Sequence, residues 1–132
     1  MKKEICVAAA EIALVKKYIE FYNSFDVFGM LSCLSDCVVF ENLVDGKTTH
    51  KTRGKSEFSI LAQESVKIFK TRKQEVISWS SEKGKLIVEL NFSGTLSENF
   101  KADDSESQDV RITGRSEFRF HNNKISEIRD IH

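Results

Sequence analysis

The chain has 132 residues and a mass of 15.1 kDa, a length typical of one domain with a single core. Hydrophobic residues make up 40% of it and include 10 Phe, so it can bury a core without disulfides or metals. Twenty basic and twenty acidic side chains cancel to a net charge of +0, which excludes the global positive field of a nucleic-acid binder. We therefore expect a single domain over residues 1–132 and no nucleic-acid partner.

Cysteine usage and the apolar runs bear on the cellular compartment. The three cysteines form neither an even set nor a C-x-x-C pair, so a disulfide framework is not expected. Glu4 and Glu11 bracket the apolar run 5–10 and leave it too short for a signal sequence. No stretch approaches the roughly 18 apolar residues of a membrane span. These patterns predict a cytoplasmic protein with no membrane partner.

The beginning of the chain predicts two helices. Apolar residues recur at three- and four-residue spacing from Ile5 to Phe25, with lysines on the opposite face, as in a long amphipathic helix. Asp26 is a typical N-cap residue, so a short second helix is expected to follow it and to close at Ser35 and Asp36.

The rest of the chain shows strand patterns around one further helix. Cys37 begins a β-branched and aromatic run, and Asp45-Gly46 is a hairpin turn signal before a short strand at Thr48–His50. A helical pattern after this hairpin predicts a third helix that ends near Lys70. Four later segments are rich in strand formers, namely 74–81, 86–96, 110–120 and 124–131. The acidic segment 97–109 is expected to be a mobile loop, and the element order is α-α-β-β-α-β-β-β-β.

Alternation in two of these strands separates an inward face from an outward face. Even-numbered residues from 86 to 96 and from 110 to 120 are mostly apolar and are expected to face inward. The candidate wall residues of an interior site are Leu90, Phe92, Phe118 and Phe120. The outward set on the second strand is Arg111, Thr113, Arg115, Glu117 and Arg119. Such interleaved charges suit a contact between two copies of the chain or a solvated surface, and both hypotheses remain open.

Four stretches spread over nearly the whole chain carry a family resemblance, namely Tyr18–Asp26, Ser35–Glu41, Arg53–Lys55 and Phe118–Asp130. With the element order, they resemble the nuclear transport factor two-like superfamily, most closely its SnoaL-like and ketosteroid-isomerase-like branches. The resemblance implies an α+β fold in which a strongly curved, mixed antiparallel sheet forms a cone around three helices. It also implies a pocket inside the cone for a small, mostly apolar ligand, and a homodimer through the convex face of the sheet.

Two side chains are candidates for catalysis inside such a cone. Tyr18 occupies the position at which ketosteroid isomerases keep a tyrosine that donates to an oxyanion, and a buried core tyrosine is the alternative. Asp130 lines up with the acidic residue that SnoaL-like cyclases use as a general acid/base. Burial in an apolar cone would raise its pKa, as a proton shuttle near neutral pH requires. The alternative is that Asp130 pairs with an arginine at the rim or at the chain end.

The resemblance to ketosteroid isomerases fails at the two carboxylates of that mechanism. Their positions hold Asn42 and Ser116, and an amide cannot take a proton near neutral pH. Both residues remain candidates for ligand binding, with Asn42 orienting a carbonyl. Cys33 and Cys37 have no partner ligands in the sequence and are expected to be buried apolar residues. We expect neither a metal nor a cofactor.

These observations predict a small-molecule pocket protein of the SnoaL-like type. Its ligand would be mostly apolar and either carbonyl-bearing or cyclic. If the protein is an enzyme, its chemistry would be proton transfer of the isomerase, cyclase or dehydratase kind. The alternative is a non-catalytic dimeric module for binding or assembly, in which Phe side chains fill the cone. The volume inside the cone separates these hypotheses.

Overall fold

Helices and strands alternate in the predicted order in the computed structural model, which describes the backbone of residues 2–98 and 109–132 and the side chains of residues 9–98 and 109–132. The helices in these ranges are α1 (Lys2–Asn23), α2 (Val27–Ser32) and α3 (Gly54–Ile68). The strands are β1 (Leu34–Val44), β2 (Lys47–Arg53), β3 (Phe69–Glu82), β4 (Lys85–Leu96), β5 (Asp109–His121) and β6 (Lys124–Ile131). The predicted mobile loop 97–109 and the side chain of Cys6 fall largely outside the described residues. No described helix is long and apolar enough to cross a membrane.

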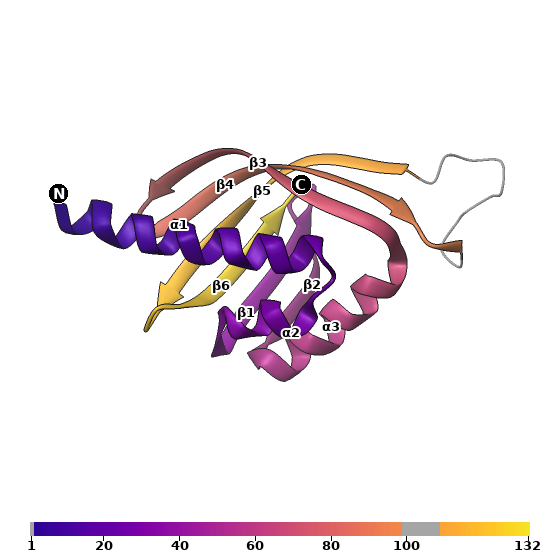
Figure 1. Ribbon diagram of the computed structural model, residues 1–132, viewed down its shortest axis with the longest axis horizontal. Coiled ribbons are helices and arrows are strands. Elements are labelled where there is room, and N and C mark those ends of the chain that lie inside the picture. Colours follow the sequence, from indigo (N-terminus) through magenta and orange to yellow (C-terminus); the bar gives the residue numbers. More distant parts are fainter. Residues whose placement is uncertain (1, 99–108) are drawn as a thin grey trace.

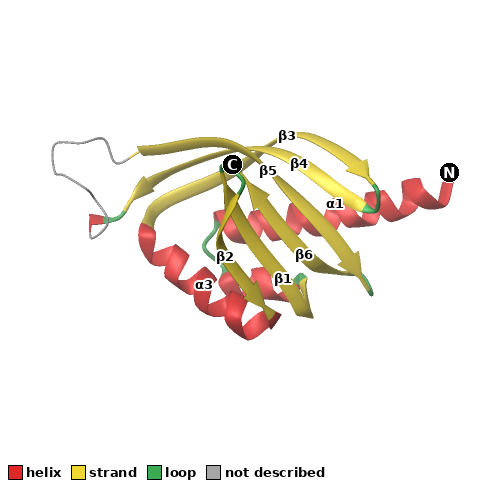
Figure 2. Cartoon of the chain, turned by 180° about the vertical axis from the view of Figure 1, so that it is seen from behind, coloured by secondary structure: helices red, strands yellow, loops and turns green. Residues whose placement is uncertain are grey.

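The six described strands form one sheet in the order β2-β1-β6-β5-β4-β3. Strands β1 and β6 are parallel, and all other neighbours are antiparallel, so the sheet is mixed as expected. The sheet is strongly curved, and α1 lies along its concave side while α2 and α3 stand at one end (Figure 1). Seen from behind, the convex side carries no described helix (Figure 2). The cone closed by three helices is therefore confirmed.

Two element boundaries differ from the sequence prediction because secondary structures join without a loop. Helix α2 begins after its N-cap Asp26, whose carboxylate accepts a hydrogen bond from the Gly29 amide at 2.8 Å. It ends at Ser32, however, and Leu34 already belongs to β1 rather than to the helix. Helix α3 likewise passes directly into β3 at Phe69, whose backbone is extended, so this strand begins five residues earlier than position 74.

The core lies between α1 and the concave face of the sheet. The buried residues of this core include Val15, Tyr18, Ile19, Leu34, Val38, Leu86, Val88, Phe118, Ile125 and Ile128. Cys33 is buried with them, as expected, but Cys37 is exposed and that prediction is wrong. Strand alternation explains the difference, because Val38 points into the core and turns its neighbour outward.

The outward face of β5 contains one carboxylate that the chain itself neutralises. Glu117 is only 5% exposed. Its oxygens lie 3.2 Å from Lys85 Nζ, 3.3 Å from Arg115 Nε and 3.5 Å from Arg129 Nη1. A carboxylate enclosed by three cations of its own chain offers no free charge to a partner, so Glu117 cannot serve a dimer contact in the way we expected. Arg111, Thr113 and Arg119 remain exposed on this face.

Candidate functional site

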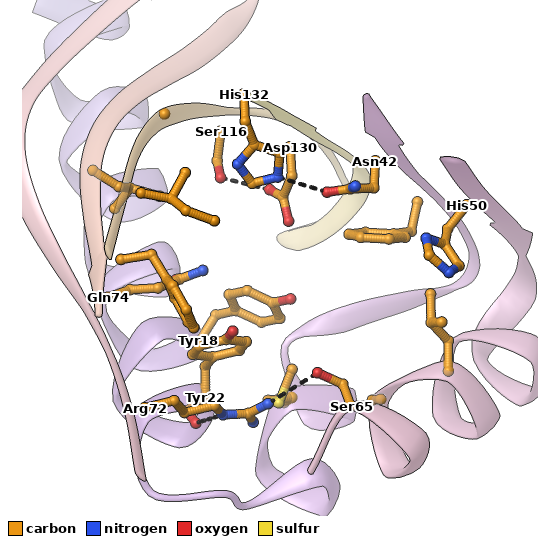
Figure 3. Close-up of a pocket in the computed structure, with 18 of the residues that line it drawn as sticks. Tyr18, Tyr22, Asn42, His50, Ser65, Arg72, Gln74, Ser116, Asp130 and His132 are labelled. Atoms are coloured by element: carbon orange, nitrogen blue, oxygen red, sulfur yellow. Dashed lines mark hydrogen bonds between the residues drawn. The ribbon is translucent and has the colours of Figure 1, made fainter. Parts of the chain in front are cut away.

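A cavity of about 490 Å³ opens between the helices and the concave face of the sheet. Its apolar walls include Met30, Phe40, Phe58, Leu61, Leu90, Phe92 and Phe118. The described side chains therefore leave space inside the cone, which favours the hypothesis of a ligand pocket over the alternative in which Phe residues fill the cone. Polar groups gather at two opposite ends of this cavity, one around Asp130 and the other around Arg72 (Figure 3).

Asp130 lies on the inner face of β6 and lines the cavity. It pairs in register with Ser116 of β5, whose hydroxyl donates to the Asp130 carboxylate with an oxygen-to-oxygen distance of 2.5 Å. Burial raises the pKa of Asp130 above its ordinary value, although the Ser116 hydrogen bond and nearby His132 act in the opposite direction. Asp130 is thus an inward carboxyl group whose environment favours the protonated form.

Tyr18 lines the same cavity from α1 and is 6% exposed. Its ring packs edge-on against Phe118, with 6.1 Å between ring centres. Among the described residues no group hydrogen-bonds to its hydroxyl, and a buried phenol of this kind gains from a ligand oxygen that accepts. Burial raises the pKa of Tyr18 well above its ordinary value, and the negative charge of Asp130 raises it further. The phenol therefore stays protonated at ordinary pH and keeps its O–H free to donate to a ligand oxygen.

Hydrogen bonds between distant parts of the chain order the rim near Asp130. Nδ2 of Asn42 donates to Thr49 Oγ1 at 2.8 Å, so its Oδ1 faces His132. Nε2 of His132 donates to that oxygen at 2.9 Å, because an amide oxygen only accepts. His50 stands beside Thr49, with its Nδ1 3.1 Å from the threonine hydroxyl. Asn42 is thus at the site, as predicted, but its amide is already held by two partners.

Arg72 of β3 forms the other polar end of the cavity, and sequence reasoning missed it. The side chain is 5% exposed, although its neighbours Thr71 and Lys73 are exposed. It belongs to the basic run 70–73, which is typical of a solvated surface. The alternation of Arg72 with Gln74 and Val76 on one face of β3 was the available signal.

The remaining wall residues fall into two groups. Leu90, Phe92, Ser116 and Phe118 line the cavity, in keeping with the inward face expected from alternation. Phe120 does not, because it lies further along β5, past a shift in register with β6, and packs beneath α1 beside Leu14 in a separate hollow. The assignment of Phe120 to the cavity wall is therefore wrong. Within the described ranges, no three His, Cys, Asp or Glu side chains gather closely enough to hold a metal ion.

The curved mixed sheet closed by three helices around an interior cavity defines the nuclear transport factor two-like class of fold. Residues 12–132 match the family described as SnoaL-like polyketide cyclase, and the chain belongs to this family. No protein of curated function matches the chain by sequence.

Solved structures with the same fold come from several bacteria. A candidate polyketide cyclase from Xanthomonas campestris superposes with a TM-score of 0.76 at 17% identity, covering 94% of this chain and 90% of that chain. A candidate SnoaL-like polyketide cyclase from Shewanella putrefaciens gives a TM-score of 0.76 at 12% identity, covering 92% and 88%. An epoxide hydrolase of the LEH-like type from M. tuberculosis gives 0.73 at 15% identity, covering 93% and 82%. At these identities the likeness shows the fold alone.

Proposed function

We propose that this protein binds a small, mostly apolar ligand that carries a carbonyl group or a ring, and that it transfers a proton on that ligand. The observation that carries the proposal is the Asp130 carboxyl group in the wall of an apolar cavity, with its pKa raised by burial. A carboxyl group with a raised pKa exchanges protons at a pH closer to neutral, as a general acid/base requires.

The roles of the neighbouring groups follow from their hydrogen-bonding capacity. Asp130 would take a proton from the carbon next to the carbonyl and return it to the same or a conjugated carbon. Tyr18 would donate its O–H to the carbonyl oxygen as negative charge develops there. Ser116 holds the Asp130 carboxylate in a single orientation. Asn42 would order the rim of the cavity through its hydrogen bonds with Thr49 and His132, and it would not transfer a proton itself. No cofactor is part of this chemistry.

Deuterium exchange on a simple cyclic ketone tests the proposal. The probe is 1-tetralone in D₂O, and the measurement is the rate at which its α protons disappear from the proton NMR spectrum. Wild type is expected to accelerate exchange above the buffer rate. Asp130→Asn should return the rate to that of buffer, and Tyr18→Phe should slow it by about ten- to a hundredfold.

The matched control is Glu127→Gln, on the same strand as Asp130. Glu127 turns outward and pairs with Arg119 at 3.2 Å, so its loss should leave exchange unchanged. Binding of the ketone without any exchange would support a non-catalytic binding protein and contradict the assigned chemistry. A rate that survives Asp130→Asn would contradict the role of this residue.

We also propose that the protein forms a homodimer and is located in the cytoplasm. The exposed arginines of β5 support a homodimer through the convex face, although Glu117 is excluded from that contact. The free thiols of Cys33 and Cys37 fit the reducing cytoplasm predicted above.

A further inference from the structure

Arg72 is a buried cation that has no acidic partner among the described residues. Its side chain is 5% exposed, and none of the ion pairs within the described ranges includes it. Glu64 is the acidic residue of the cavity wall on α3, and it pairs with Lys67 at 3.4 Å instead. A buried charge is costly without a counter-charge, so this arrangement needs an explanation.

The guanidinium is held in place by neutral groups. Nε donates to the backbone oxygen of Tyr22 at 3.0 Å, and Nη1 donates to Ser65 Oγ at 3.3 Å. The central guanidinium carbon lies 3.7 Å from the centre of the Tyr22 ring and 4.7 Å from that of Phe25. These contacts come from α1, α3 and the loop after α1, so they fix the orientation of the group before any ligand arrives.

The backbone beneath Arg72 is fixed as well. The Asn23 side chain accepts from the Gln74 amide at 2.7 Å and donates to the Gln74 carbonyl at 3.1 Å. This pair of bonds ties the end of α1 to β3 two residues beyond Arg72. The guanidinium is therefore pre-organised rather than an arm that swings into solvent.

One nitrogen of this fixed group has no hydrogen-bond partner. Nη2 of Arg72 is buried and unpaired within the described part of the chain, while Arg72 lines the cavity. Burial also lowers the pKa of the guanidinium from its ordinary value, in the direction expected for a cation that lacks a counter-charge. An oxyanion at this end of the cavity would supply the missing counter-charge, and a carboxylate is the anion that arginine pairs with most strongly.

We propose that Arg72 anchors a carboxylate of the ligand, so that the cavity selects small aromatic or alicyclic keto acids. This inference rests on the proposed function, because it places the reacting carbonyl at the opposite end of the cavity, near Asp130 and Tyr18. The two polar ends face each other across the apolar walls in Figure 3. A bound acid would thus span the cavity, with its charge at β3 and its reacting carbon at β6.

A pair of nearly isosteric probes tests this assignment. The probes are 1-tetralone-6-carboxylate and 1-tetralone-6-carboxamide, and calorimetry at about pH 8 measures the dissociation constant of each. A hydrogen-bonded charge pair predicts that wild type binds the acid about ten- to a hundredfold more tightly than the amide. Arg72→Gln should abolish this preference, whereas Asp130→Asn should keep it and lose only the exchange reaction.

Two further variants make the test specific. Arg53→Gln removes an exposed arginine of β2 and should leave the preference intact. Arg72→Lys keeps the charge without the planar fork, so the preference should fall by about tenfold. If Arg72→Gln does not fold, Arg72→Lys takes its place in the test. An unchanged preference for the acid in Arg72→Lys would count against the proposal.

The outcomes separate this inference from the proposed function. Equal binding of acid and amide by wild type, or a preference that survives Arg72→Gln, overturns the carboxylate anchor and leaves Asp130 chemistry standing. Failure of wild type to bind either probe overturns both. A preference lost in Arg72→Gln and retained in Asp130→Asn supports the anchor by itself.

Discussion

The hydrogen bond between Ser116 and Asp130 makes a quantitative prediction for Ser116→Ala. The two residues face each other on paired strands, 2.5 Å apart between oxygens, and Ser116 is 3% exposed. A hydrogen bond to a charged group contributes about 1.5–3 kcal/mol to stability. We expect this loss in the free energy of unfolding at about pH 8, where Asp130 carries its charge.

The loss should be smaller in acid. Burial raises the pKa of Asp130 in the folded protein, so the fold favours the protonated form and loses stability as the pH rises through that pKa. At about pH 4 the raised pKa shifts the carboxyl group toward its protonated form, in which its bond to Ser116 is one between neutral groups. Such a bond contributes about 0.5–1.5 kcal/mol, so the effect of Ser116→Ala should fall to roughly half.

Urea denaturation at the two pH values measures this difference. With a slope of about 1.5 kcal/mol per molar urea, the midpoint at pH 8 should drop by about 1–2 M. The control is Thr113→Ala on the same strand, because its hydroxyl bonds Asn91 on the exposed face and should contribute about 0.5 kcal/mol or less. In the double variant with Asp130→Asn, most of the loss at pH 8 should disappear.

Two results would contradict the predicted role of the hydrogen bond between Ser116 and Asp130. An equal loss at both pH values would mean that the cost comes from packing and not from the charge of Asp130. No loss at pH 8 would mean that the hydrogen bond is absent in solution.

Three further predictions follow from single contacts. Asp130→Asn should raise the melting temperature at about pH 8, because it removes a buried charge, and it should have little effect at about pH 4. A lower melting temperature of the variant at pH 8 would contradict this. Gly114→Ala should cost about 1–3 kcal/mol in urea denaturation, because the added Cβ would lie 2.7 Å from the backbone oxygen of Ile131, and an unchanged midpoint would argue against this close approach. Sedimentation equilibrium should show a dimer at tens of micromolar, a range chosen for ordinary dimers, that Arg111→Glu with Arg119→Glu weakens, whereas a monomer in wild type would refute the convex-face contact.

Local patterns in the sequence predicted the elements and much of the cavity wall. The spacing of apolar residues identified α1 and α3, and Asp45-Gly46 predicted the turn between β1 and β2, where both residues have positive φ. Alternation placed Leu90 and Phe118 on the inner face, because the side chains of a strand point in turn to either side. The position of Asp130 beside Ile128 on β6 followed from the same rule.

Tertiary contacts decided the states of the charged and polar groups. Arg72 lies in a basic run of the kind found on solvated surfaces. It can be buried because the backbone oxygen of Tyr22, 50 residues away, accepts a hydrogen bond from its Nε. Glu117 alternates with exposed arginines, yet three cations from three different strands enclose it. Asn42 is ordered by His132 across 90 residues.

The difference between what local patterns predict and what tertiary contacts decide has a physical reason. Periodicity reflects the geometry of one helix or one strand, and a few neighbouring residues suffice to specify it. The burial of a charge depends on whether distant groups arrive to satisfy it, and those groups meet only when the sheet curves and the helices close the cone. The sequence by itself therefore determined the fold and the inward strand faces, whereas the folded chain alone decided that Arg72 and Asp130 stand at opposite ends of one cavity.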